Sequence, residues 1–223
     1  MLILFDIDGT LLHASGAGRD ATRAALLEVF GEAAEVDMHR FGGKTDWFTL
    51  LQLLEPRGFA PGTIELRMKQ YDETVARHLD VIIKQRQVYA LPGAMTAVKV
   101  LHQRSDVTLG VVTGNVASNA PIKLRAAGFD PDWFEVGAYG SEAIIRDELP
   151  RLAHQRAEAL TGKTFPPSDV IVIGDTPADV TSARAFGAKS IAVLTGFAER
   201  EEIEAAKPDH ILPDLTGLLP LLG

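Results

Sequence analysis

Short, continuous apolar runs separated by helical patterns are the feature of this sequence that most constrains its fold. The runs carry Val, Ile and Leu on consecutive positions, which is typical of strands buried on both faces of a parallel sheet. The stretches between them have helical periodicity, and several end at a glycine, a common C-terminal stop. This alternation predicts a doubly wound α/β fold. The predicted strands are Leu2–Phe5, Thr108–Val112, Val170–Ile173, Ser190–Leu194 and His210–Leu212, and the predicted helices are Met95–His102, Ala120–Ala127, Leu149–Leu160 and Ala178–Phe186.

The connection between the first two strands is too long for that rhythm. It spans about a hundred residues, although a crossover with its helix needs far fewer. We therefore expect a Rossmann-like core domain made of residues 1–14 and 88–223, with a small all-helical cap domain, residues 15–87, inserted after the first strand. The helical patterns within the insertion are Arg19–Phe30, Asp46–Leu54 and Ile64–Leu79.

Charge and cysteine content exclude several classes of function. The formal net charge is −8, so nucleic acid and anionic membranes are not natural partners. The chain has no cysteine, which excludes thiolate catalysis and cysteine-bound zinc and fits a reducing cytoplasm. No stretch approaches the ~20 apolar residues of a membrane helix, and the first apolar run is too short for a signal peptide. We expect a cytoplasmic monomer or homodimer.

Polar side chains follow three of the predicted strands at the point where each strand ends. Asp6 and Asp8 follow the first strand, Thr113 follows the second, and Asp175 and Asp179 follow the third. Because the carboxyl ends of parallel strands meet at one edge of a sheet, we expect these side chains to lie together.

A cluster of carboxylates of this kind favours one sort of chemistry. Crowded carboxylates repel one another unless a cation or protons intervene. Hard oxygen ligands without His or Cys favour Mg²⁺. A carboxylate can also act as a nucleophile and form an acyl phosphate, and a second carboxylate can transfer protons.

The same segments resemble motifs one, two and four of the haloacid dehalogenase-like hydrolase superfamily. The matching segments are Asp6-Ile7-Asp8-Gly9-Thr10, Thr113 after its apolar strand, and Gly174-Asp175 through Asp179. The helical insertion after motif one resembles the subclass with a small helical cap, which includes phosphoglycolate phosphatases and β-phosphoglucomutase. The resemblance covers essentially the whole chain. It implies a Mg²⁺-dependent phosphoric monoester hydrolase acting on a small phosphorylated metabolite, such as phosphoglycolate or a sugar phosphate.

The resemblance also implies a role for each matching residue. Asp6 would be the nucleophile and Asp8 the general acid/base. Mg²⁺ would be bound by the Asp6 carboxylate, the Asp8 backbone carbonyl and Asp175. Thr113 would donate a hydrogen bond to a phosphoryl oxygen, together with backbone N–H groups near Asp8 and Gly114.

The sequence leaves alternatives open for two site assignments, the cation of motif three and the role of Asp179. The superfamily's motif three is a Lys or Arg, and the common Lys-Pro-x-Pro form is absent here. We choose Arg146, ahead of Arg151 and Lys163, because it stands where a loop meets a helix start. Asp179 would support the metal, or cap the helix that Thr176 begins, or do both.

The loop Phe41-Gly42-Gly43-Lys44-Thr45-Asp46 is the most suggestive part of the insertion. It resembles the Gly-(Lys/Arg)-Thr-Asp loop of many caps in this subclass. Two glycines permit close backbone approach, and a lysine suits an anionic leaving group. Alternatively, Thr45 or Asp46 simply caps the next helix. The predicted substrate contacts are Gly43, Lys44, Thr45, Gly114 and Asn115.

Three other functions compete with phosphatase activity. A phosphomutase of the β-phosphoglucomutase type would use the same aspartates and Mg²⁺, but it would return the phosphoryl group to its substrate. A dehalogenase would need neither the metal nor Asp8. A non-catalytic binding module would keep the fold without turnover.

Overall fold

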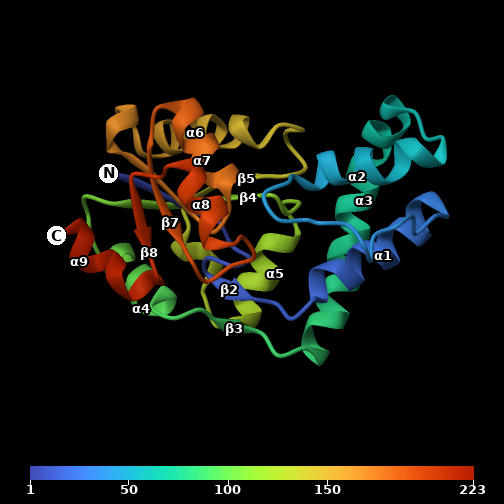
Figure 1. Ribbon diagram of the computed structural model, residues 1–223, viewed down its shortest axis with the longest axis horizontal. Coiled ribbons are helices and arrows are strands. Elements are labelled where there is room, and N and C mark those ends of the chain that lie inside the picture. The colour runs from blue at the N-terminus through green and yellow to red at the C-terminus, as the bar shows by residue number, and fades with distance from the viewer.

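A six-stranded parallel sheet lies at the centre of the structure, a computed structural model that describes residues 1–223 (Figure 1). The strand order is β5-β4-β1-β6-β7-β8, and every neighbouring pair is parallel. The expected doubly wound fold is confirmed. The strands are β1 (Leu2–Phe5), β4 (Thr108–Thr113), β5 (Val136–Tyr139), β6 (Val170–Gly174), β7 (Lys189–Val193) and β8 (His210–Leu212).

Alternate residues of the buried central strand β1 pack on opposite faces of the sheet. Ile3 and Phe5 pack in one apolar cluster with α4 (Ala94–His102), whereas Leu2 and Leu4 pack in a second one with α6 (Leu149–Thr161). Figure 1 shows α6 above the sheet and α4 below it. None of the helices combines the length and the apolar character that a membrane span requires. The other helices of this part are α5 (Asn119–Ala126), α7 (Pro177–Phe186), α8 (Arg200–Ala206) and α9 (Leu218–Leu222).

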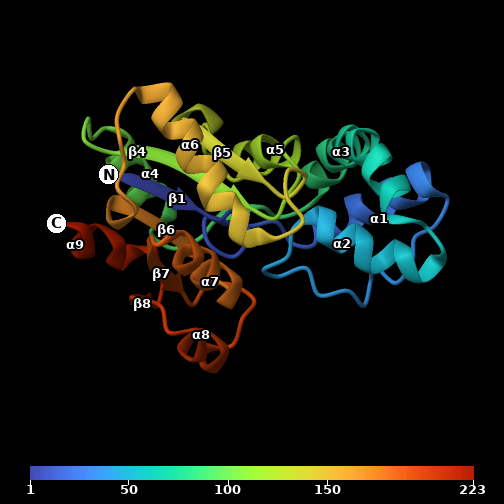
Figure 2. The same ribbon diagram turned by 90° about the horizontal axis from the view of Figure 1, so that it is seen from above.

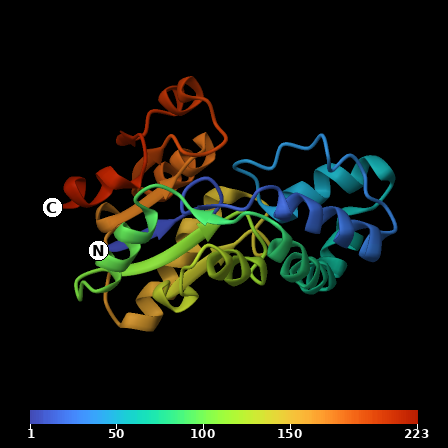
Figure 3. The same cartoon turned by 90° about the horizontal axis from the view of Figure 1, so that it is seen from below.

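The inserted segment forms a group of helices beyond one end of the sheet, as Figures 2 and 3 show from opposite sides. The helices are α1 (Ala17–Phe30), α2 (Asp46–Leu54) and α3 (Pro61–Ile82). The chain enters and leaves this group through two short antiparallel strands, β2 (Leu12–His13) and β3 (Tyr89–Ala90). The boundaries proposed above, residues 15–87 for the cap and 1–14 with 88–223 for the core, stay a prediction.

Sequence reasoning missed several elements, and for four of them the physical reason is clear. Strands β2 and β3 have two residues each, too few to show a period. In β5, Gly137 interrupts the apolar run, because the Tyr139 ring fills the space that a side chain at 137 would need. Helix α8 is highly charged and buries only Ile203, so it shows no apolar face.

Candidate functional site

The carboxyl ends of β1, β4 and β6 meet because β1 pairs with both other strands. Asp6 directly follows β1, Thr113 is the last residue of β4, and Asp175 directly follows β6. All three side chains are buried. From β1 the chain continues to β4 and β5 on one side of β1, and then to β6, β7 and β8 on its other side. Ligands bind at such a reversal of strand order in sheets of this type.

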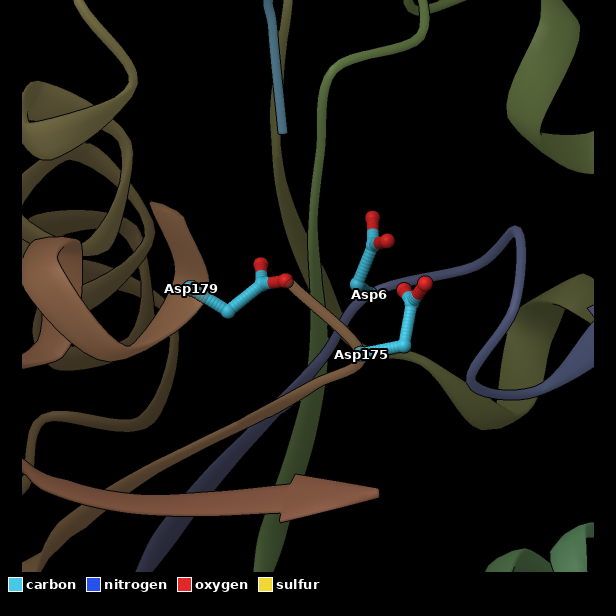
Figure 4. A group of neighbouring side chains, drawn as sticks. All are labelled: Asp6, Asp175 and Asp179. Atoms are coloured by element: carbon cyan, nitrogen blue, oxygen red, sulfur yellow. The ribbon is translucent and has the colours of Figure 1, made fainter. Parts of the chain in front are cut away.

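Three carboxylates gather at this point, from Asp6, Asp175 and Asp179. One oxygen of each lies within 4.8 Å of the others. Figure 4 shows Asp6 and Asp175 side by side, with Asp179 pointing toward them. Burial raises the pKa of Asp6 to about 6, against the lowering effect of Arg146. Burial, together with Asp6 and Asp179, raises the pKa of Asp175 well above its usual value. Such a group of hard oxygen donors with excess negative charge fits a divalent cation of the Mg²⁺ type.

Two glycines lie against the Asp175 carboxylate. Gly9 has φ +87°, and a β-carbon there would lie 2.5 Å from Asp175 Oδ2. A side chain at Gly196 would collide with the same carboxylate. The backbone N–H of Phe197 donates to Asp175 Oδ2 at 3.0 Å. The two glycines therefore allow two loops to close around one buried acid.

Arg146 is the cation that the structure brings to this cluster. It stands just before α6, is 7% exposed, and directs Nη2 to Asp6 Oδ1 at 3.2 Å and to Asp179 Oδ1 at 2.5 Å. Burial lowers the pKa of Arg146, but the carboxylates of Asp179 and Asp6 raise it by a larger amount, so the guanidinium stays charged. The alternatives lie elsewhere: Arg151 is exposed, and exposed Lys163 donates to a backbone carbonyl at Ser105.

Asp179 caps a helix, which is one of the two roles that its sequence position suggested, and it also pairs with the buried cation. Its Oδ2 accepts hydrogen bonds from the backbone N–H and the hydroxyl of Thr176 at 3.0 and 2.6 Å, which forms a capping box at the start of α7. Its Oδ1 pairs with Arg146. Gly174 leaves room for this carboxylate, because a side chain there would overlap it. Metal binding by Asp179 stays a prediction.

Asp8 lies in a second charged group, which contains a residue that sequence reasoning missed. Lys123, from α5, is 4% exposed and places Nζ 2.6 Å from Asp8 Oδ2 and 2.6 Å from Asn115 Oδ1. The amide of Asn115 also donates to Asp8 Oδ2 at 2.8 Å. A signal was present: Lys123 follows Ala120 and precedes Leu124 on the buried face of its helix, where lysine is rare.

The loop after β4 is in direct contact with the inserted helices. The backbone N–H of Asp46 donates to Gly114 O at 2.7 Å, and that of Trp47 donates to Gly140 O at 2.9 Å. In return, the Asp46 carboxylate accepts from the Val116 N–H at 2.9 Å. Gly114 is required here, because a side chain would collide with the carbonyl of Lys44.

The predicted substrate contacts of the loop 41–46 lie near this contact between the inserted helices and the loop after β4. Thr45 accepts a hydrogen bond from the Phe48 N–H at 3.1 Å and so caps α2, which is the alternative role predicted for it above. Gly43, at φ +75°, approaches Ala178 at the start of α7. The Lys44 ammonium lies 3.4 Å from His39 Nε2. Substrate binding by Gly43, Lys44 and Thr45, and by Gly114 and Asn115, stays a prediction.

Comparisons with known proteins agree with this geometry. A family model described as haloacid dehalogenase-like hydrolase matches residues 1–187. A phosphoglycolate phosphatase of Pectobacterium atrosepticum is 24% identical, over 99% of this chain and 92% of that protein. The protein CbbY of Rhodobacter capsulatus is 25% identical, over 96% and 93%. The solved structure of CbbY from Rhodobacter sphaeroides in complex with phosphate has a TM-score of 0.72 at 21% identity, and covers 97% of this chain and 95% of that one.

Proposed function

We propose that this chain, which belongs to the haloacid dehalogenase-like hydrolases and is a phosphoric monoester hydrolase, uses Mg²⁺ and an aspartyl-phosphate intermediate. Its substrate is a small phosphorylated metabolite of the phosphoglycolate or sugar-phosphate type. The names of the relatives support this substrate class, because a phosphoglycolate phosphatase matches nearly the whole chain. We assign the enzyme to the cytoplasm, which the absence of cysteine fits.

The observation that carries the proposal is the position of Asp6. Its carboxylate lies at the centre of the site, with Arg146 Nη2 at 3.2 Å and the carboxylates of Asp175 and Asp179 beside it. A phosphoryl group at this point meets a nucleophile and a cation together. Asp8, two residues along the chain, lies close enough for its charge to raise the pKa of Asp6, and its carboxyl group can serve the leaving oxygen.

Each step then belongs to a residue of this chain. Asp6 attacks phosphorus, and the ester P–O bond breaks as Asp8 gives its proton to the leaving alcohol oxygen. Asp8 next takes a proton from water, which attacks the aspartyl phosphate and releases inorganic phosphate and the free Asp6 carboxylate. Arg146 and the Thr113 hydroxyl hold the phosphoryl oxygens throughout. Positioning and charge neutralisation supply most of the rate enhancement.

The donor set fits a magnesium ion. The Asp6 carboxylate, the Asp8 backbone carbonyl and Asp175 would hold it, with support from Asp179. When bound, the ion would offset the charges of nucleophile and phosphate, so that two anions can approach.

The test is hydrolysis of a broad panel of metabolite phosphates by the purified protein with and without Mg²⁺. We expect phosphate release from at least one small ester, dependence on Mg²⁺, and loss of turnover in Asp6→Asn and in Asp8→Asn. The panel includes a hexose phosphate with and without a bisphosphate activator, because isomerised product would instead identify a phosphomutase. If no member of the panel is hydrolysed, the proposal is wrong.

A further inference from the structure

We propose that Lys123 is a positioning residue for Asp8: with Asn115, it fixes one carboxylate oxygen of Asp8 so that the other faces the leaving oxygen. This inference rests on the proposed function, since it assigns a task within that reaction. Lys123 and Arg146 are the only buried cationic side chains, and burying an ammonium is costly unless it is paired and hydrogen-bonded.

The two buried cations serve different carboxylates. Arg146 pairs with Asp6 and Asp179, on the side where the nucleophile lies. Lys123 pairs with Asp8 alone. The site therefore holds two separate ion pairs, one for the nucleophile and one for the proposed acid/base.

The hydrogen bonds around Asp8 are unequal at its two oxygens. Oδ2 accepts from Lys123 Nζ at 2.6 Å and from Asn115 Nδ2 at 2.8 Å, whereas Oδ1 accepts no hydrogen bond from a side chain. The Asp8 side chain remains 29% exposed, although that of Lys123 is 5% exposed. Oδ1 is thus the oxygen left to exchange a proton with a ligand.

Asn115 is held in a single orientation by its partners. Lysine can only donate, so the amide oxygen must face Lys123, and its NH₂ group then faces Asp8 Oδ2. The same NH₂ group donates to Thr113 Oγ1 at 2.8 Å. The closed ring of Asp8, Asn115 and Lys123 is therefore tied to the strand end that carries Thr113.

The cap covers this ring without taking part in it. A β-carbon at Gly18, in the first turn of α1, would lie 3.1 Å from Lys123 Nζ. The members of the ring all come from the segments that follow β1 and β4. The orientation of Asp8 is consequently set by the core and survives movement of the cap.

The consequence depends on the leaving group. An alkyl ester releases a strongly basic alkoxide and needs the proton of Asp8, whereas p-nitrophenyl phosphate releases a stable anion and needs it little. If Lys123 orients the proton donor, its loss will slow the first step, in which the alcohol departs, far more for the alkyl ester than for the aryl ester. A residue with only a structural role would slow both equally.

The experiment compares Lys123→Met with wild type on p-nitrophenyl phosphate and on the alkyl phosphate that wild type hydrolyses fastest. We expect kcat/KM, which reports the steps up to departure of the alcohol, to fall about 100-fold for the alkyl ester and less than about fivefold for the aryl ester. Lys123→Gln keeps a donor and should recover part of the loss, and it is assayed in the same way if the methionine variant does not fold. Lys69→Met, at an exposed position, is the matched control.

Equal losses of kcat/KM on both esters would overturn the inference, and so would an unchanged kcat/KM for the alkyl ester. Both outcomes leave the proposed function standing, because wild type is active in them. Absence of wild-type activity on every ester would reject the proposed function, and the inference with it.

Discussion

At the scale of single residues, the site is a set of buried charges that compensate one another only in part. Asp6, Asp175 and Asp179 carry three carboxylates, and Arg146 supplies one positive charge among them. A buried charge that loses its partner is strongly destabilising, because the desolvation cost remains when the attraction is gone. Arg146 should therefore matter for stability as well as for turnover.

Replacing Arg146 with methionine tests this double role. We expect kcat to fall at least about 100-fold, and the free energy of unfolding to fall by about 3 kcal/mol at neutral pH without metal, because Asp6 and Asp179 lose their counter-charge. The measurements are steady-state kinetics and urea denaturation. Arg151→Met and Lys163→Met are the controls and should change neither; a comparable loss of turnover in either would move the motif-three assignment away from Arg146.

The crowded carboxylates also predict how metal binding depends on pH. Because the pKa of Asp6 is raised to about 6 and that of Asp175 is raised as well, the metal-free site holds protons that Mg²⁺ must displace. Affinity for Mg²⁺ should therefore weaken as the pH falls through about 6. Isothermal titration calorimetry at pH 5 and pH 7.5, in buffers of different ionisation enthalpy, measures both the affinity and the protons released. Asp175→Asn should abolish binding; an affinity independent of pH would contradict the account.

At the scale of elements, the loop 41–46 joins the inserted helices to the loop after β4. Asp46 is central to this contact, because its backbone N–H and its carboxylate both bond to the segment Gly114–Val116. Burial raises the pKa of Asp46 to about 6, although the Val116 N–H and Lys123 favour its charged form. The folded state therefore binds a proton at Asp46 more tightly than the unfolded chain does.

This shift predicts the stability of Asp46→Asn as a function of pH. A raised pKa in the folded state gives stability that is full below about pH 4 and is lost as the pH rises through about 6. Wild type should lose about 2 kcal/mol over that interval relative to Asp46→Asn, which keeps an acceptor for Val116 but cannot ionise. Denaturation at pH 4 and pH 7 gives the difference, with Asp147→Asn at an exposed position as control. Parallel stability curves for wild type and Asp46→Asn would disprove the assignment.

The elements also show how far sequence reasoning reaches. Strands β1, β4 and β6 are continuous apolar runs, so their ends, and with them Asp6, Thr113 and Asp175, could be predicted. Strand β5 could not, because its apolar run is interrupted by Gly137, where a side chain would collide with the Tyr139 ring. Lys123 could not be paired with Asp8, because more than a hundred residues separate them and a single sequence carries no signal for that contact.

At the scale of the whole molecule, one apolar cluster runs from β1 through the inserted helices. It includes Phe5 in the sheet, Leu26 in α1 and Val75 in α3. The insertion therefore packs directly on the core, and the loop 41–46 sits against the loop that carries Gly114. Because Asp6 is only 6% exposed, we expect this contact to open when a substrate binds.

A crosslink between α3 and the start of α5 should prevent the inserted helices from moving away from the core. The Asp72 carboxylate accepts from the Ser118 N–H at 3.2 Å, and the chain has no cysteine of its own. In the double variant Asp72→Cys with Ser118→Cys, a short thiol crosslinker should lower turnover at least about tenfold, and a cleavable version should restore it on reduction. Each single variant treated alike is the control. Full activity of the crosslinked protein would show that opening here is not needed.

The proposed mechanism requires that Asp6 becomes phosphorylated during turnover. Its most direct test is acid quenching of Asp8→Asn with p-nitrophenyl phosphate and Mg²⁺, followed by mass spectrometry of the peptides. This variant still accepts a phosphoryl group from an activated ester but cannot activate water to remove it. We expect one hydroxylamine-labile phosphoryl group, on Asp6, which is absent when Asp6→Asn is added. A stable phosphoryl group on another residue, or none under conditions where wild type turns over, would contradict it.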